Sequence, residues 1–170
     1  DVSVMGVVAL TSGLAALLDS AKQEVLIQSP YLILDPKALE LLGSLVRRGV
    51  KVRISTNSAA NNDNHYAVSG YRKQREQILA AGIEVHELKP HPQHQTRILQ
   101  RYAQFGEHPP IIVLHAKTAV IDRRILVVGT YNLDPRSQNL NTEAAVVMPS
   151  NKLAAEAAAA IEEDMKPENS

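Results

Sequence analysis

Apolar residues recur along the chain with two periods, one typical of helices and one typical of strands. In Leu39–Val46 the leucine and valine positions lie three or four apart, which indicates an amphipathic helix that Asp35 caps and Gly49 ends. Val50–Ser55 alternates apolar and polar residues, which indicates a half-buried strand. The same patterns predict further helices over Ser12–Lys22, His65–Ala81 and 151–164, and further strands over Glu24–Gln28, Ile83–Leu88, Val113–Ile121, Ile125–Tyr131 and Ala144–Met148.

The order of these elements predicts the fold class. Strands and helices alternate in the first half, and the last strands follow one another as an antiparallel addition. We expect an α/β/α layered domain with a mixed, mostly parallel sheet. We expect residues 1–165 to form this single domain and 166–170 to form a polar tail. Lys89–Pro110 has no clear period and is predicted to be a long loop with a helical turn near Leu99–Ala103.

The two strands around Asp122 are predicted to form a hairpin that carries chemistry. A turn centred between Arg123 and Arg124 would pair His115 with Asn132 and Lys117 with Thr130. An imidazole can attack phosphorus or donate a proton to a leaving oxygen, and an ammonium, a hydroxyl and an amide can bind the non-bridging oxygens. This square of side chains predicts a phosphodiester site that needs no glycine-rich loop.

Three charged residues near the hairpin are predicted to complete the site. Asp122, at the strand end, is expected to pin the turn or support the site from behind. Glu143 precedes the next strand, and we expect it to hold the second nitrogen of the His115 imidazole, as an orienting carboxylate does in a triad. Arg136 follows Asn132 closely and could add a bidentate phosphate contact.

The pattern His115-x-Lys117-x4-Asp122-x6-Gly129-Thr130-x-Asn132 resembles the signature of the phospholipase D superfamily. Thr130 stands where that family usually has serine, so the hydroxyl is kept. The continuation Asn132–Ser137 with Asn141-Thr142-Glu143 is similar to the bacterial cardiolipin synthase branch, and upstream segments such as Ser29-Pro30-Tyr31 and Thr56-Asn57-Ser58 agree with it. The resemblance covers about residues 6 to 148 and is to the second half of such a synthase.

This resemblance implies a function and partners. We expect phosphatidyl transfer between phospholipids through a phosphohistidine intermediate. The expected substrate is phosphatidylglycerol, and phosphatidylethanolamine is the alternative one. One half of the active site would lie on this chain, and a second such domain, either an N-terminal half or a dimer mate, would supply the other. His115 would then be the general acid. Phospholipase D hydrolysis, a phosphodiesterase nuclease and a non-catalytic scaffold remain alternatives. The expected location is peripheral at the bacterial inner membrane.

Composition narrows these alternatives. The chain of 170 residues has 18 basic and 18 acidic residues, so its net charge does not attract nucleic acid and no nucleic-acid partner is expected. It has no cysteine, which excludes disulfides and thiolate zinc sites. No apolar run is long enough to span a membrane. We expect no cofactor and no divalent metal, because Lys117 takes the charge-neutralising role that a metal plays elsewhere.

Three other polar groups are weaker candidates. His86, His91, His94 and His108 are close in sequence, but their spacing fits no regular zinc pattern, so solvated loop histidines are the favoured interpretation. The segment Asn57–His65 follows a strand and is either a ligand-contacting loop or a flexible polar one. The basic run Tyr71–Arg75 is expected to be the solvated face of a helix rather than a head-group site.

Overall fold

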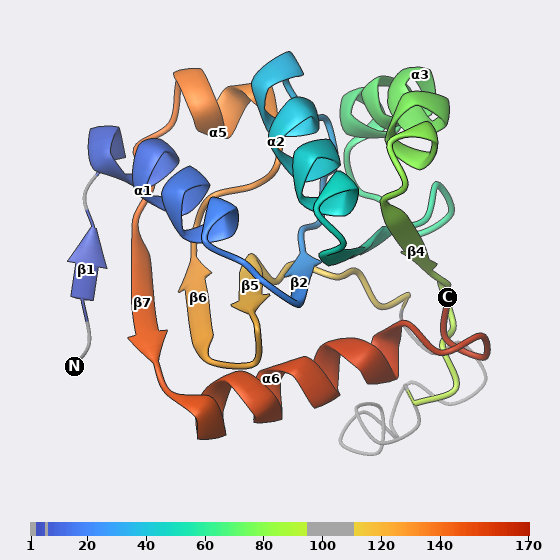
Figure 1. Cartoon of the computed structure of the whole chain (residues 1–170). Helices are drawn as coiled ribbons and strands as arrows, with labels where there is room; N and C mark the ends of the chain where they lie inside the picture. The colour runs from blue at the N-terminus through green and yellow to red at the C-terminus, as the bar shows by residue number, and fades with distance from the viewer. Residues whose placement is uncertain (1–2, 6, 95–110) are drawn as a thin grey trace.

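A mixed β-sheet forms the middle layer of the structure, a computed structural model that describes residues 3–5, 7–94 and 111–170. Within these residues the sheet has seven strands in the order β1-β7-β6-β5-β2-β3-β4 (Figure 1). The strands are β1 Ser3–Met5, β2 Glu24–Gln28, β3 Lys51–Asn57, β4 Glu84–Leu88, β5 Thr118–Ile121, β6 Ile125–Gly129 and β7 Ala145–Pro149. The predicted loop and helical turn over Leu99–Ala103 lie outside the described residues.

The strand directions correct one part of the fold prediction. Only two neighbouring pairs within the described residues are parallel, β2 with β3 and β3 with β4. The other four pairs, β1–β7, β7–β6, β6–β5 and β5–β2, are antiparallel. The mixed sheet was therefore predicted correctly, but the expectation that it is mostly parallel was wrong. The hairpin β5–β6 inserts antiparallel strands into the middle of the sheet instead of at its edge.

Helices cover both faces of the sheet, which confirms the α/β/α layering. In Figure 1, α1, α2 and α3 lie on one side and α6 crosses the other side alone. Apolar residues alternate between the two layers: Val25 and Ile27 of β2 join the core under α1 and α2, whereas Leu26 packs with Ile161 of α6. The helices are α1 Val7–Asp19, α2 Pro36–Arg47, α3 His65–Ala80, the short α5 Pro135–Asn139 and α6 Asn151–Asp164.

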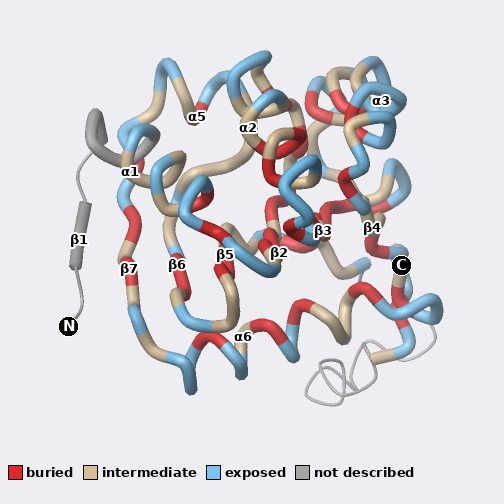
Figure 2. Tube along the Cα trace, in the orientation of Figure 1, coloured by how far each residue is buried: buried red, intermediate tan, exposed pale blue. Residues whose placement is uncertain are grey.

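Helix ends follow the local signals of the sequence. The carboxylate of Asp35 accepts a hydrogen bond from the Ala38 N–H at 2.6 Å, and Pro36 occupies the first turn of α2. Gly49 follows the end of this helix with φ of +85°, a conformation that glycine adopts without steric cost. These predictions are confirmed. The buried residues in Figure 2 follow the inner faces of the helices, including the sheet-facing side of α6.

The hairpin between β5 and β6 has a different register from the predicted one. Thr118 lies opposite Val128 and Ile121 opposite Ile125, so the turn is centred on Arg123. Asp122 and Arg123 both have positive φ, and the N–H of Arg124 donates to the Ile121 oxygen at 3.0 Å. The pairs His115–Asn132 and Lys117–Thr130 were therefore wrong by one position.

Two elements were absent from the prediction, and the polar tail is packed. The sequence pattern predicted neither β1 nor α5, both of which are very short. Asn169, in the segment 166–170, is fully buried, and its backbone oxygen accepts from the Lys89 N–H at 2.9 Å. The tail therefore closes the end of α6 against the segment that follows β4.

Candidate active site

An open cleft lies where β6 ends and the chain enters β5. Its volume is ≈ 750 Å³, within the range of small-molecule sites. It brings together five of the seven predicted site residues, His115, Lys117, Thr130, Asn132 and Glu143. The remaining lining residues are Gly129, Leu140, Asn141 and Thr142.

His115 and Lys117 form one corner of the cleft. Both lie on the extended segment just before β5, so the strand is shorter than the predicted Val113–Ile121. His115 is exposed, and Lys117 is half-buried. The Lys117 Nζ donates to the His115 backbone oxygen at 2.8 Å and lies 3.1 Å from Nδ1 of the imidazole.

The surroundings of Lys117 act on its pKa in opposite directions. Burial lowers the pKa, whereas the carboxylates of Glu143, Asp63 and Asp134 raise it, and the net shift is downward. A phosphate in the cleft would add negative charge beside the ammonium and favour its charged form. Lys117 is therefore placed to bind the anionic part of a substrate.

Thr130 and Glu143 form the opposite wall. The Thr130 hydroxyl donates to the Glu143 carboxylate and accepts from the Ala144 N–H at 3.0 Å. Asn141 Nδ2 also donates to Glu143, at 3.1 Å. Burial alone would raise the pKa of Glu143, but these donors, together with Ser137 and the charge of Lys117, hold it below its usual value. Glu143 is therefore a buried, ionised carboxylate.

The structure gives Glu143 different partners from the predicted one. Glu143 accepts hydrogen bonds from Thr130, Asn141 and Ser137 rather than from the imidazole of His115. Arg136 does not line the cleft; its Nε donates to Asn141 Oδ1 at 3.3 Å. The arginine thus supports Asn141, which in turn holds Glu143.

Asn132 faces the cleft from a loop that α5 fixes. Its backbone N–H donates to the Ser137 hydroxyl at 3.2 Å, and Asp134 caps α5 by accepting from the Ser137 N–H at 2.7 Å. The side-chain Oδ1 of Asn132 is buried without a hydrogen-bond partner among the described residues. Such a polar atom is costly to leave unpaired.

Asp122 lies at the far end of β5, away from the cleft lining. Its carboxylate accepts from the backbone N–H groups of Lys22, Gln23 and Glu24 at 2.9, 2.8 and 3.0 Å. Burial would raise its pKa, but these three donors outweigh it and lower the pKa. This geometry matches the expected role of pinning the turn, because the hairpin is tied to the start of β2.

Two asparagines of the segment Asn57–His65, which was predicted to be either a ligand-contacting or a flexible loop, hold the residues that lead to His115. Asn57 is buried, and its amide donates to the Leu114 oxygen at 2.9 Å and accepts from the Leu114 N–H at 2.8 Å. Asn61 donates to the Ile112 oxygen at 3.1 Å. The end of β3 and the loop that follows it therefore position the segment before His115. The sequence did show an asparagine-rich run after a strand, but the pattern alone did not tell which role this run has.

The other candidate groups lie elsewhere. His94 pairs with Asp164 at 3.1 Å, burial lowers the pKa of His86, and His108 lies outside the described residues. No set of three or more histidine, aspartate or glutamate side chains within the described ranges is placed to hold a metal ion. In the basic run on α3, Tyr71 and Arg75 bond to Glu87, at 2.7 and 2.9 Å.

The arrangement can bind and transform a phosphodiester. An ammonium, a hydroxyl and an amide converge from two sides on a cleft that also holds one imidazole. The ammonium and the amide N–H groups can neutralise and hydrogen-bond the non-bridging oxygens, while the imidazole attacks phosphorus or protonates a leaving group. None of the helices within the described residues is long and apolar enough to cross a membrane.

Comparison with known proteins agrees with this chemistry. The chain is 36% identical over 138 residues to cardiolipin synthase C of Escherichia coli, covering 81% of this chain and 28% of that protein. It thus spans little more than a quarter of this relative's length. Its fold is similar to that of Nuc from Salmonella typhimurium, a phospholipase D family member (TM-score 0.72, 18% identity, 100% and 96% of the two chains covered). It is also similar to phosphatidylserine synthase from Haemophilus influenzae (TM-score 0.67, 17% identity, 97% and 38% covered).

The family described as "Cardiolipin synthase, PLD-like domain" matches residues 14–165, which include every residue of the cleft. The match runs from the middle of α1 to the end of α6 and so covers both helical layers and the hairpin. The chain therefore belongs to the cardiolipin synthase branch of the phospholipase D-like domains.

Proposed function

We propose that the protein transfers a phosphatidyl group from one phospholipid to another, and that this chain carries one half of the active site. The observation that carries the proposal is the convergence of His115, Lys117, Thr130 and Asn132 on one cleft. The names of the relatives, cardiolipin synthase and phosphatidylserine synthase, supply the substrate class. Phosphatidylglycerol is the acceptor we propose, and phosphatidylglycerol or phosphatidylethanolamine the donor.

The two-step exchange needs two imidazoles. A nucleophilic histidine attacks phosphorus, the bond to the head-group oxygen breaks, and a second histidine donates its proton to that oxygen. The second histidine then takes a proton from the incoming glycerol hydroxyl, which attacks the phosphohistidine and releases the nucleophile. His115 is the sole imidazole that lines the described cleft, and we assign it the acid–base role. The nucleophile would come from a second domain of the same kind.

Each remaining residue has a defined part in this scheme. Lys117 and Asn132 bind the non-bridging oxygens, and the Thr130 hydroxyl lies beside them. Glu143 accepts a hydrogen bond from the Thr130 hydroxyl, whose oxygen accepts from the Ala144 N–H, and so holds this wall of the cleft in place. Asp122 acts at a distance by anchoring the hairpin.

The surface around the cleft supports a lipid substrate. Leu140 lines the cleft and is 80% exposed, so an apolar side chain stands at the mouth of a polar site. Tyr66, at the start of α3 and outside the cleft lining, is 90% exposed. Such side chains can enter the head-group region of a bilayer, which supports the proposed peripheral location at the bacterial inner membrane.

The test compares lipid and nucleic-acid substrates. The longest natural chain that contains this domain is incubated with vesicles of phosphatidylglycerol and phosphatidylethanolamine, and separately with single- and double-stranded DNA. Cardiolipin is the expected product, and His115→Asn, which keeps a similar size and polarity, should abolish it. Phosphatidic acid without cardiolipin would indicate hydrolysis instead. Degraded DNA with neither lipid product would overturn the lipid assignment.

A further inference from the structure

A tyrosine and an aspartate that the scheme above does not use form a pair beside the catalytic cleft. Tyr31 follows β2, and its hydroxyl donates to Asp63 Oδ1 at 3.0 Å. Tyr31 is half-buried, whereas Asp63, just before α3, is exposed. Within the part of the chain that the structure describes, the Asp63 side chain accepts no other hydrogen bond and forms no ion pair. Its second oxygen, Oδ2, is therefore open to a ligand.

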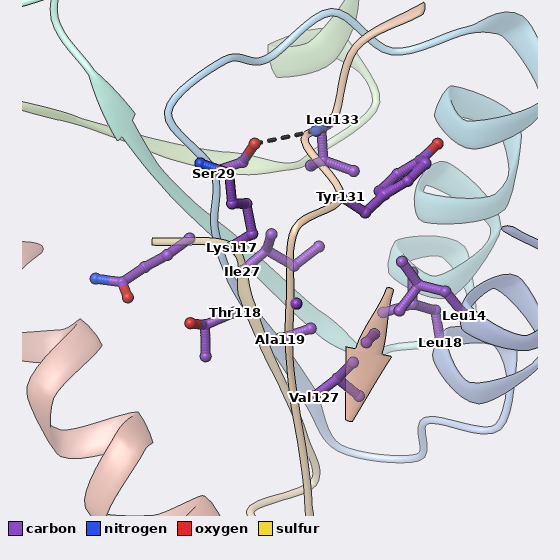
Figure 3. A pocket seen from close by; sticks show the side chains of 13 residues that line it. Leu14, Leu18, Ile27, Ser29, Lys117, Thr118, Ala119, Val127, Tyr131 and Leu133 are labelled. Atoms are coloured by element: carbon purple, nitrogen blue, oxygen red, sulfur yellow. Dashed lines mark hydrogen bonds between the residues drawn. The ribbon is translucent and has the colours of Figure 1, made fainter. Parts of the chain in front are cut away.

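Backbone contacts place Tyr31 beside Asn132. Leu32 pairs with Leu133 in a parallel bridge, and both side chains pack in the core under α1 and α2. The Ser29 hydroxyl accepts from the Leu133 N–H at 3.0 Å, as Figure 3 shows, and donates to the Tyr31 backbone oxygen at 2.6 Å. Because side chains alternate along an extended chain, Tyr31 and Asn132 point to the side opposite the two leucines. Asn132 lines the cleft, so Tyr31 lies next to that wall.

A single amide joins the segment of Tyr31 to that of His115. Asn57 Nδ2 donates to the backbone oxygen of Pro30 at 3.3 Å and to that of Leu114 at 2.9 Å. Pro30 immediately precedes Tyr31, and Leu114 immediately precedes His115. The backbone at Tyr31 is therefore tied to both walls of the cleft.

The charge of Asp63 acts on the cleft. Burial lowers the pKa of Lys117, and the carboxylates of Glu143 and Asp63 oppose this shift. Burial and the hydrogen bond to Asp63 raise the pKa of Tyr31, so the phenol keeps the proton that it donates. The Asp63 carboxylate would repel a phosphate. The pair is therefore suited to a ligand group that donates hydrogen bonds and not to an anion.

We propose that Tyr31 and Asp63 form the subsite for the glycerol head group of the acceptor phosphatidylglycerol; the proposal rests on the proposed phosphatidyl transfer. In the second step, one glycerol hydroxyl gives its proton to His115, its oxygen bonds to phosphorus, and the bond from phosphorus to the nucleophilic imidazole breaks. The neighbouring glycerol hydroxyl donates a hydrogen bond to Asp63, whose position Tyr31 fixes. Holding one hydroxyl of a diol in this way orients the other for attack.

A neutral diol fits this pair better than the ammonium of phosphatidylethanolamine does. An ammonium at Asp63 would lie in the field of the positively charged Lys117, and like charges repel. A hydroxyl carries no such penalty. The acid–base role of His115 also brings the acceptor alcohol to this side, because the attacking oxygen must reach the imidazole.

The experiment lets two acceptor lipids compete that differ by one hydroxyl. The longest natural chain containing this domain is given equal amounts of phosphatidylglycerol and of a deoxy analogue, whose head group keeps the terminal hydroxyl and lacks the central one. Both acceptors react with the same phosphatidyl-enzyme, so the ratio of their products reports acceptor preference however fast that intermediate forms. Mass spectrometry separates cardiolipin from its deoxy counterpart.

The parent should form at least about tenfold more cardiolipin than deoxy product, as expected for one hydrogen bond to a charged group. Asp63→Ala should bring the ratio close to one, and Tyr31→Phe should lower it severalfold because the carboxylate loses its support. Asp63→Asn keeps an acceptor oxygen and should retain part of the preference. Glu76→Ala, which removes an exposed carboxylate of α3, is the matched control and should keep the parent ratio.

An Asp63→Ala ratio equal to that of the parent would overturn the subsite, because a merely structural role lowers both products together. An unchanged ratio with a raised KM for phosphatidylethanolamine as donor would assign the pair to an ammonium instead. Tyr31→Phe provides the same comparison if Asp63→Ala does not fold. If the parent forms neither product, the proposed function itself has failed and the subsite fails with it.

Discussion

The ammonium of Lys117 donates a hydrogen bond to the backbone oxygen of His115 at 2.8 Å and lies 3.1 Å from Nδ1 of its imidazole. The two residues are neighbours on one side of an extended segment, so the lysine bends back over the histidine. A bound phosphate would attract this ammonium toward its oxygens. Lys117 would then couple substrate binding to the position of the acid–base group.

Lys117→Ala should lower kcat on the order of 100-fold, because one preorganised charge-stabilising donor is lost. The fold should be retained, since the side chain is only half-buried. Steady-state kinetics on phosphatidylglycerol vesicles measures the effect. Lys22→Ala, which removes an exposed lysine whose backbone alone contacts Asp122, is the control and should behave as the parent. A Lys117→Ala protein within threefold of the parent would contradict the assignment.

Thr130→Val should weaken catalysis at the acidic side of the pH range. The variant removes the hydroxyl that donates to Glu143, so the ionised carboxylate is less stabilised and its pKa, now below the usual value, should rise. The acid limb of the kcat/KM profile should therefore move to higher pH. Thr130→Ser keeps the hydroxyl and should restore the parent limb. Identical profiles for valine and serine would show that the hydroxyl has no electrostatic role.

Local signals in the sequence predicted most helices and strands because those signals act over a few residues. The Asp35 cap, Pro36 and Gly49 set the limits of α2 without help from the rest of the fold. The hairpin register depends on Asp122 and Arg123 adopting positive φ. Neither residue is a glycine, so the sequence contains no local signal for this turn. The mostly parallel sheet was wrong because strand direction is decided by where the hairpin inserts, a long-range property.

The site, too, has residues that local sequence patterns predicted and residues that they missed. His115, Lys117, Thr130 and Asn132 were predicted from spacing along one hairpin, and they reach one cleft despite the wrong register. Asn57 was missed as a supporting residue because it acts on Leu114, 57 positions away in the sequence. Contacts of this kind follow from the packing of β3 beside the incoming segment and have no local pattern.

Asn57→Ala should reduce kcat more than it raises KM. Its buried amide pairs with both the N–H and the oxygen of Leu114, next to His115. Removing it leaves two buried backbone groups unpaired, at a cost of about 1–3 kcal/mol each. Denaturant unfolding and steady-state kinetics measure stability and activity together. Asn139→Ala on α5, which removes an exposed local contact, is the control. A stable Asn57→Ala protein with parent kcat would refute the supporting role.

Asp122→Asn should destabilise the fold at neutral pH by about 1–2 kcal/mol, since the charge that accepts three backbone hydrogen bonds is lost. Asparagine tolerates the positive φ of this position, so the backbone is not strained. The folded-state pKa of Asp122 is lowered, so its contribution is present above the unfolded pKa and is lost as pH falls through the folded value.

The stability difference between parent and Asp122→Asn should thus be full at pH 7 and shrink below about pH 4. Urea unfolding at several pH values measures it. Asp19→Asn, at an exposed ion pair with Arg48, is the control and should change stability by less than about 0.5 kcal/mol. A difference that stays constant down to acid pH would contradict the charge-based anchor.

Gly129→Ala should both destabilise the domain and distort the cleft. A Cβ at Gly129 would meet the Ala144 backbone oxygen and come within 2.8 Å of the Ala145 Cβ, so β6 and β7 would have to separate. Overpacking of this kind costs about 1–3 kcal/mol. Because Gly129 lies opposite Lys117 and immediately precedes Thr130, activity should fall more than stability alone explains.

Gly43→Ala, inside α2 where the nearest atom is the flexible end of Arg47 at 3.4 Å, is the matched control and should be neutral or slightly stabilising. Thermal unfolding and kinetics on both variants give the comparison. Equal stability and activity for the two would show that the close approach of β6 and β7 does not shape the site.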